Sequence, residues 1–364
     1  MKIMTILGTR PEIIRLSLII KKLDTYSHHI LVHTGQNFDD NLSLVFFKEL
    51  GVREPDYYLG VQADSFAGQI GKILIEIEKV ILEEKPDRIL VLGDTNSGLA
   101  SIVARRLGIP VFHMEAGNRC FDSRVPEEVN RVIIDHCSSI FLPYTHKSKE
   151  NLLGEGIRNE LIYVIGNPIY EVITHFSAEI EASKVFQKFG LEFRKYFLVT
   201  MHREENVDDE YRLKGAFTGI DRISAEYNFP VICSVHPRTR SKIEQSKLEI
   251  PNKDITLSEP FGFFDFVHLE KNAACVITDS GTVQEECCIF GTPNITIRDV
   301  TERPETIECG SNILASVSPK VMLKSVEIAL GEPRNWEPPP EYLDKNVSSK
   351  VVKIVVGYLT ELGG

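Results

Sequence analysis

The 364-residue sequence lacks the features of several protein classes. Its formal net charge is -11, so no general basic field is available for binding nucleic acid. No apolar run reaches about 18 residues, the length that a membrane-spanning helix needs. The apolar start of the chain is interrupted at Arg10-Pro11-Glu12, too early for a signal peptide. We therefore expect a cytoplasmic protein with no nucleic-acid or membrane partner.

Several site motifs are also missing. The seven cysteines form no CxxC pair, so we expect reduced, buried thiols. Neither His nor Cys clusters at the spacing of metal ligands. The sequence "GTRPE" follows the first predicted strand in place of G-x-G-x-x-G, and no P-loop or nucleophile elbow occurs. We expect neither a metal nor a cofactor such as NAD.

Short apolar runs alternate with helical patterns along the chain. The run at 88–92 is almost uniformly apolar, as in a parallel strand buried on both faces. From 65 to 81, apolar residues recur at helical spacing. This alternation predicts a doubly wound α/β fold. The predicted strands are Ile3–Leu7, His29–His33, Arg88–Leu92, Val111–Met114, Ser139–Leu142, Tyr196–Thr200, Pro230–Val235, Cys275–Thr278 and Asn294–Ile297.

The alternation pauses at the turn Gly166-Asn167-Pro168, a candidate hinge, and then restarts. The fold class we predict is α/β, with two Rossmann-like doubly wound domains facing each other across a cleft. Their expected bounds are 1–167 and 168–345. A C-terminal helical segment, 346–364, is expected to pack back on the first domain.

Polar residues follow many of the predicted strands. Ligands of open α/β sheets bind beyond the carboxyl ends of the strands, where such turns lie. Asp94, Glu115, Glu127, Glu286 and His202 fall in these turns or in nearby loops. Each could be structural, for example as a helix N-cap. Structural charges usually scatter over the surface, however, so their gathering predicts a functional site.

The turn Ser280-Gly281-Thr282 opens a predicted helix and suits a phosphate. A helix N-terminus offers N–H groups and partial positive charge to an anion, and Gly281 allows close approach. Glu286 lies about 9 Å further along the helix, close to the span from a diphosphate to a ribose. Thr282-x-x-Glu285 matches a capping box, so we expect Glu285 to cap the helix.

Motifs in order along the whole chain carry a family resemblance. The chain resembles the non-hydrolysing UDP-N-acetylglucosamine 2-epimerase family. The resemblance implies a GT-B-like pair of Rossmann domains with the active site between them, a homodimer, and no NAD or metal. The matching segments are "GTRPE" at 8–12, "TGQ" at 34–36, "GDT" at 93–95, "EAG" at 115–117, "PEEVNR" at 126–131, "GN" at 166–167, "HREEN" at 202–206, "DSGTVQEE" at 279–286 and "RDVTERPE" at 298–305.

This resemblance implies inversion at C2 of a UDP-N-acetylhexosamine. UDP is eliminated to leave a 2-acetamidoglycal and is then added back, with the C2 proton delivered to the other face. The implied catalytic residues are Asp94, Glu115, Glu127 and His202, and which carboxylate is the base stays open. The residues assigned to substrate binding are Arg10, Arg15, Arg131, Phe266, Ser280, Gly281, Thr282, Glu286 and Arg303.

Departures from the family pattern bear on the sugar. Thr282 stands for a Gly, Arg15 for a Lys, and "MHREEN" for "GHRREN". Asp39, where the family's regulatory segment has Gln, argues against activation by a second UDP-sugar. These changes resemble the branch that converts UDP-2-acetamido-2,6-dideoxy-L-talose to UDP-N-acetyl-L-fucosamine for capsule or O-antigen synthesis. UDP-N-acetylglucosamine remains the alternative substrate.

Other classes share parts of this pattern. A GT-B glycosyltransferase would have the same fold and nucleotide site, but would not need three carboxylates facing the sugar. A hydrolysing epimerase would release free sugar and UDP. A non-catalytic UDP-sugar sensor would bind without turnover.

Overall fold

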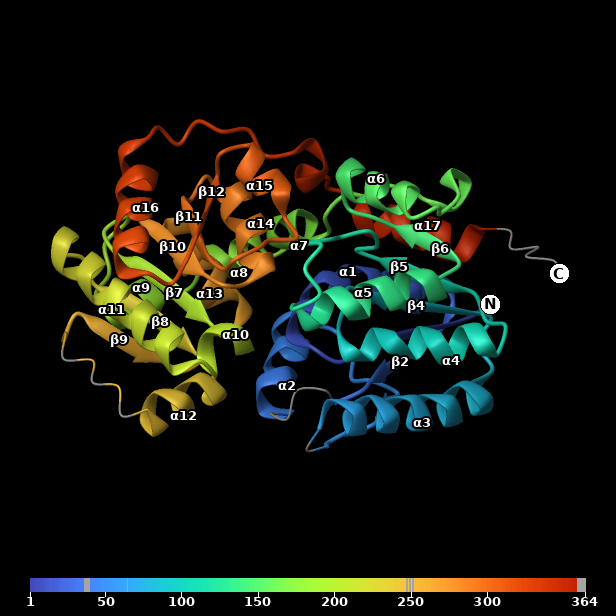
Figure 1. Cartoon of the computed structure of the whole chain (residues 1–364). Helices are drawn as coiled ribbons and strands as arrows, with labels where there is room; N and C mark the ends of the chain where they lie inside the picture. The colour runs from blue at the N-terminus through green and yellow to red at the C-terminus, as the bar shows by residue number, and fades with distance from the viewer. Residues whose placement is uncertain (36–39, 64, 247, 249, 251, 359–364) are drawn as a thin grey trace. The chain divides into compact units, whose positions relative to one another are not determined.

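The computed structural model (Figure 1) describes residues 1–35, 40–63, 65–246, 248, 250 and 252–358. The segment from Gln36 to Asp39, which carries the expectation about a regulatory site, lies outside these residues. The chain forms two compact units. The first comprises Met1–His175 and Pro340–Gly364, and the second comprises Phe176–Pro339. The boundaries expected from the sequence were 167/168 and 345/346.

The first unit contains a six-stranded sheet in which every pairing is parallel. Its order, β3-β2-β1-β4-β5-β6, is the doubly wound Rossmann order. Strand order reverses between β1 and β4, which makes that place the switch point where such sheets bind ligands. The strands are β1 Lys2–Leu7, β2 His28–His33, β3 Tyr57–Tyr58, β4 Arg88–Leu92, β5 Val111–Met114 and β6 Ile140–Leu142.

Helices cover both faces of this sheet. On one face α3, α4 and α5 lie side by side (Figure 1) and share an apolar core with β1, β2, β4 and β5. Elsewhere α17 packs on α1, and Lys22 Nζ donates to Ser348 Oγ at 2.7 Å. The helices of the unit are α1 Arg10–Tyr26, α2 Asp40–Glu49, α3 Phe66–Glu84, η1 Asn96–Leu99, α4 Ala100–Arg106, α5 Pro126–Cys137, α6 His146–Gly154, η2 Asn159–Leu161, α7 Ile169–His175, η3 Pro340–Leu343 and α17 Val347–Gly357.

The second unit repeats the same design. Its parallel sheet has the order β12-β11-β10-β7-β8-β9, so the reversal lies between β7 and β10. The strands are β7 Phe197–Met201, β8 Val231–Val235, β9 Ile255–Ser258, β10 Cys275–Thr278, β11 Asn294–Ile297 and β12 Asn312–Ala315. The helices are α8 Ser177–Glu181, α9 Val185–Phe189, α10 Glu204–Val207, α11 Glu210–Tyr227, α12 Pro237–Gln245, α13 Phe263–Asn272, α14 Gly281–Phe290, α15 Pro304–Glu308 and α16 Pro319–Gly331.

The two Rossmann-like units predicted from the sequence are confirmed. The predicted strands are all present, within a residue or two at their ends. The strands that the prediction missed, β3, β9 and β12, are edge strands with partly exposed residues, so they lack a uniform apolar run. Among the described residues, the helices are all too short or too polar to cross a bilayer.

The turn Gly166-Asn167-Pro168 lies within the first unit. Asn167 is buried, and its backbone N–H donates to the Glu341 carbonyl at 2.9 Å. Gly166 has a φ of +89°, and a Cβ there would lie 2.8 Å from Asp344 Cβ. The turn is therefore packed tightly against η3 and the residues that follow it.

Candidate functional site

Glu12 joins the two turns at the switch point of the first unit. Its Oε2 accepts from the Gly8 backbone N–H at 3.0 Å and from Thr9 Oγ1 at 2.8 Å. Its Oε1 accepts from Thr95 Oγ1, which follows β4, at 3.1 Å. Burial raises the pKa of Glu12 to about 7, against the lowering effect of these hydrogen bonds. Glu12 belongs to the motif "GTRPE", but the sequence alone predicts no role for it.

Asp94 follows β4 directly and is held by Arg131 of α5. Arg131 donates to Asp94 Oδ2 from Nη2 at 2.5 Å and from Nε at 3.2 Å, and its Nη1 lies 2.6 Å from Glu128 Oε2. The Arg131 side chain is 2% exposed, whereas that of Asp94 is 26% exposed. Arg131, predicted to bind substrate, is thus engaged by two carboxylates, and it leaves Asp94 fixed yet accessible.

Glu115 follows β5 in a left-handed backbone conformation, with a φ of +65°. A residue other than Gly is uncommon in this conformation, and its presence points to a functional constraint. Asn118 Nδ2 donates to Glu115 Oε1 at 3.0 Å. Glu115 Oε2 lies 3.6 Å from the position a Cβ would take at Gly93, so this carboxylate lies beside the turn that carries Asp94.

The other predicted residues of the first unit lie on helices. Glu127 is partly exposed in the first turn of α5, one turn before Arg131. Arg10 begins α1, and its guanidinium lies 5.8 Å from the centre of the Phe46 ring. Arg15, further along α1, is buried. The structure thus brings Asp94 and Glu115 together, with Glu127 on the helix that supplies Arg131.

A buried carboxylate, Asp279, organises the switch point of the second unit. It accepts from the backbone N–H groups of His202 at 3.1 Å and Arg203 at 3.0 Å, and from Asn206 Nδ2 at 3.1 Å. His202 Nδ1 lies 3.3 Å from Asp279 Oδ1, and the imidazole is 49% exposed. Asp279 therefore fixes the turn after β7 beside the turn after β10. The sequence signal that could have found it is an Asp placed directly after a buried strand.

Ser280 and Gly281 begin α14 as predicted, but the capping box is wrong. Ser280 is the N-cap, and its Oγ lies 3.0 Å from Thr282 Oγ1 with no bond to the helix backbone. Because the helix starts at Gly281, one residue before Thr282, Glu285 falls in its second turn and is buried. There Glu285 accepts from Arg303 Nε instead of capping the helix.

An arginine cluster surrounds Glu302 beside this helix start. Arg298 Nη1 lies 2.8 Å from Glu302 Oε2, Arg203 Nη2 lies 3.5 Å from Oε1, and Arg303 Nη1 lies 4.0 Å from Oε1. A Cβ at Gly281 would lie 2.5 Å from Glu302 Oε1. A side chain at position 281 would therefore displace this carboxylate or the start of α14. Three guanidinium groups concentrate positive charge near the α14 N-terminus.

Phe266 and Glu286 complete the predicted set in the second unit. Phe266, on α13, packs partly buried against an apolar cluster that includes Val283 of α14. Glu286 is buried on α14, one helical turn beyond Thr282. The α13–α14 pair thus carries several of the residues assigned to substrate binding.

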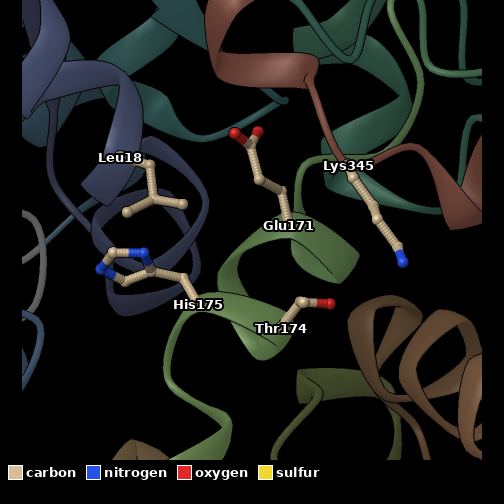
Figure 2. Close-up of a pocket in the computed structure, with 5 residues that line it drawn as sticks. All are labelled: Leu18, Glu171, Thr174, His175 and Lys345. Atoms are coloured by element: carbon tan, nitrogen blue, oxygen red, sulfur yellow. The ribbon is translucent and has the colours of Figure 1, made fainter.

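A cavity of about 230 Å³ elsewhere in the first unit (Figure 2) is not this site. None of the residues predicted to be catalytic or to bind substrate lines it. Glu171, one of its lining residues, accepts from the Ser348 backbone N–H at 2.7 Å and so anchors α17. The cavity is lined by Leu18, Glu171, Thr174, His175 and Lys345.

Comparison with known proteins decides the family. Residues 21–356 match the family model described as UDP-N-acetylglucosamine 2-epimerase. The chain is 46% identical over 348 residues to the UDP-N-acetylglucosamine 2-epimerase of Methanocaldococcus jannaschii, covering 93% of this chain and 95% of that protein. The chain belongs to the UDP-N-acetylglucosamine 2-epimerase family. It is accordingly a non-hydrolysing UDP-sugar 2-epimerase, an isomerase that acts at C2.

A solved structure of a relative agrees with the fold of this epimerase, and the names of its relatives differ in the sugar. A crystal structure of the M. jannaschii UDP-GlcNAc 2-epimerase in complex with UDP-GlcNAc and UDP aligns with a TM-score of 0.93 at 44% identity, over 98% of this chain and 100% of that one. The UDP-2,3-diacetamido-2,3-dideoxy-D-glucuronate 2-epimerase of Pseudomonas aeruginosa is 39% identical over 337 residues, covering 91% of this chain and 93% of that protein. Relatives at similar identity thus differ in substrate, and membership of the family leaves the hexosamine of this epimerase open.

Proposed function

We propose that this epimerase converts UDP-2-acetamido-2,6-dideoxy-L-talose to UDP-N-acetyl-L-fucosamine. The observation that carries the proposed chemistry is the placement of its residues at two switch points. Asp94 and Glu115 follow β4 and β5 in the first unit, while His202 and Ser280 follow β7 and β10 in the second. Ligands of doubly wound sheets bind at these places.

The first unit supplies acid and base in this proposal. One of the carboxylates of Asp94, Glu115 and Glu127 removes the proton from C2 as the C1–O bond breaks. UDP leaves with the bonding electron pair, and a C1=C2 double bond remains in the 2-acetamidoglycal. UDP then adds back to C1 through its terminal phosphate oxygen, while an acid on the opposite face protonates C2. Inversion needs a base and an acid on opposite faces, which a set of carboxylates can supply.

The second unit stabilises the departing diphosphate. Its negative charge grows as C1–O breaks, so groups placed before the reaction lower the barrier. The α14 N-terminus, which Ser280 does not cap through its side chain, offers backbone N–H groups. His202 and Arg303 add polar and positive groups beside it, and Glu286 accepts the ribose hydroxyls.

The choice of a 6-deoxy-L sugar rests on the departures from the family pattern. Thr282 places a hydroxyl beside that of Ser280 at the phosphate turn. The segment "MHREEN" has Glu204 in place of a cation of the family pattern, and Glu204 pairs with Arg238 at 2.6 Å. The second candidate is UDP-N-acetylglucosamine, which the name of the M. jannaschii relative favours.

Turnover in heavy water tests the reaction. Wild-type protein with each UDP-sugar in D2O should exchange the C2 hydrogen for deuterium and give both C2 epimers by NMR. Asp94→Asn should lower this exchange by about 100-fold or more, the scale of a lost acid–base group. The control Glu76→Gln, at a partly exposed residue of α3, should match wild type. A transferase would leave C2–H untouched, a hydrolysing enzyme would release free sugar, and a sensor would not turn over.

A side-by-side assay tests the substrate. We expect kcat/KM for UDP-2-acetamido-2,6-dideoxy-L-talose to exceed that for UDP-N-acetylglucosamine. Turnover of UDP-N-acetylglucosamine alone would reject the 6-deoxy-L-talo substrate and leave the epimerase chemistry intact.

A further inference from the structure

A second carboxyl group lies behind Glu286. Glu270, on the neighbouring helix α13, is 0% exposed, and its carboxyl lies within hydrogen-bonding reach of the Glu286 carboxyl. Cys287 Sγ donates to Glu270 Oε1 at 3.3 Å. The other oxygen, Oε2, is buried and receives no hydrogen bond from the residues that the structure describes. None of the described Arg, Lys or His side chains forms an ion pair with Glu270.

Such a group is not stable as a carboxylate. A buried carboxyl that has no counter-ion, and a thiol as the donor to one oxygen alone, is strongly disfavoured in its ionised form and takes up a proton instead. Cys287, which donates to Glu270, belongs with Leu269 and Val283 to an apolar core cluster of these helices. Burial, and next the charge of Glu286, raise the pKa of Glu270 well above its ordinary value.

The proton on Glu270 can form a hydrogen bond to Glu286. A protonated carboxyl has one O–H donor, and the acceptor beside it is the Glu286 carboxylate. Glu286 is 6% exposed, so it is the member of the pair that reaches the surface of the helix pair. An ionised carboxylate has room for about four hydrogen bonds, enough for one from Glu270 and two from a ribose.

We propose that Glu270 is a neutral carboxylic acid whose O–H is donated to Glu286 and positions that carboxylate for the ribose hydroxyls of UDP. Glu270 is a positioning residue and does not touch the nucleotide. The hydrogen-bond chain then runs from the Cys287 thiol to Glu270, and from Glu270 to Glu286. This inference rests on the proposed function in one respect, the assignment of Glu286 to the ribose.

Two substitutions separate a donor from a space-filling group. Glu270→Gln keeps an N–H donor without an ionisable group, and Glu270→Met fills a similar volume with no donor. We expect Glu270→Gln to bind UDP within about threefold of wild type. Glu270→Met should bind UDP about tenfold more weakly, which corresponds to about 1.4 kcal/mol for a lost hydrogen bond to a charged group.

The ribose dependence gives a readout that a purely structural role would not move. Calorimetric titration with UDP, 2′-deoxy-UDP and pyrophosphate compares the nucleotide affinities with that of the phosphate site. In Glu270→Met the preference for UDP over 2′-deoxy-UDP should fall toward one, with pyrophosphate affinity unchanged. An unchanged preference in Glu270→Met, or an equal loss in Glu270→Gln, would overturn the role of Glu270.

An infrared measurement and a variant of Glu286 complete the test. Well above pH 7, where Glu12 has released its proton, the infrared C=O band of a protonated carboxyl should be present in wild type and absent in Glu270→Gln; its absence from wild type overturns the inference even if Glu270→Met does not fold. Glu286→Gln tests the assignment to ribose. If Glu286→Gln leaves the UDP preference intact, the ribose assignment fails and the inference fails with it. If only Glu270→Met leaves it intact, the ribose assignment stands and the role of Glu270 is rejected.

Discussion

The guanidinium of Arg131 donates two hydrogen bonds to the carboxylate of Asp94, with Nη2 at 2.5 Å and Nε at 3.2 Å from the same oxygen. Because Arg131 is buried and Asp94 is partly open, the pair fixes the direction of an accessible carboxylate. We infer from this geometry that Arg131 positions Asp94, whereas the sequence leads to the expectation that it binds substrate. The two roles predict different kinetics.

For Arg131→Lys we expect kcat to fall about 10- to 100-fold with KM changed less than threefold. Lys keeps the charge but cannot hold both hydrogen bonds, so Asp94 loses its orientation. A residue that binds substrate would instead show its loss mainly in KM. Steady-state kinetics distinguish these outcomes. Arg124→Lys, at an exposed pair with Asp122, is the matched control and should behave as wild type.

Glu115 permits a test that separates backbone from side chain. Its φ of +65° costs about 1 kcal/mol for a residue other than Gly. Glu115→Gly should therefore leave the melting temperature unchanged or higher, while turnover falls by about 100-fold or more. Glu115→Ala should lose the same activity without that gain in stability. A loss of stability in Glu115→Gly equal to that in Glu115→Ala would show that the Glu115 side chain, and not its backbone conformation, determines how this residue affects the stability of the protein.

Position in the chain explains what the sequence could predict. Asp94, His202 and Ser280 each lie within two residues of the end of a largely apolar strand, so strand prediction places them at the carboxyl edge of a sheet. Glu270 could not be found this way, because its partner Glu286 is brought close only by the packing of α13 on α14. The capping box failed for a related reason. A pattern of residue types cannot tell that Arg303, from a later loop, competes for Glu285.

The sequence also does not predict the order of the strands in each sheet. The apolar runs indicate parallel strands buried on both faces, but not which two lie on either side of the reversal. That Asp94 and Gly8 flank one switch point, and His202 and Ser280 the other, follows only from the pairing of β1 with β4 and β7 with β10.

Glu12 should make stability fall as pH rises toward neutrality. Burial raises its folded-state pKa from 4.5 to about 7. The folded protein therefore holds a proton that the unfolded chain has released between about pH 4.5 and 7, and the free energy of unfolding drops through that window. The full contribution is at most about 3 kcal/mol. Above pH 7 this group adds no further slope.

Thermal and urea unfolding between pH 5 and 8 measure this effect. Glu12→Gln can still accept from Gly8 and Thr9 and can donate to Thr95 Oγ1, but it does not titrate. Relative to wild type, it should gain stability as pH rises from 5 to 7. Glu76→Gln, at a partly exposed residue, should follow the wild-type profile. Parallel profiles for wild type and Glu12→Gln would contradict the raised pKa.

Cys309 should be the reactive thiol of the protein. The Cys288 and Cys309 sulfurs lie 3.6 Å apart, and the hydrogen bond between them lowers the pKa of Cys309 to about 6, although burial opposes the shift. Iodoacetamide at pH 7 should therefore alkylate Cys309 ahead of Cys120, whose pKa burial raises to about 11. Peptide mass spectrometry measures both rates in one sample. Cys288→Ala should slow the reaction at Cys309, and an unchanged rate would reject the thiol–thiol hydrogen bond as its cause.

Gly281→Ala should damage the phosphate turn. The added Cβ would lie 2.5 Å from Glu302 Oε1, and Glu302 is held in place by Arg298 at 2.8 Å. The start of α14 or this ion pair must shift, at a cost of about 1–3 kcal/mol. We expect UDP affinity to fall at least about tenfold.

The matched control is Gly71→Ala on α3, where a Cβ would meet nothing within 4 Å among the described residues. That change should stabilise the protein by up to about 1 kcal/mol and leave UDP binding unchanged. Equal UDP affinity in the two variants would show that the α14 start does not hold the diphosphate.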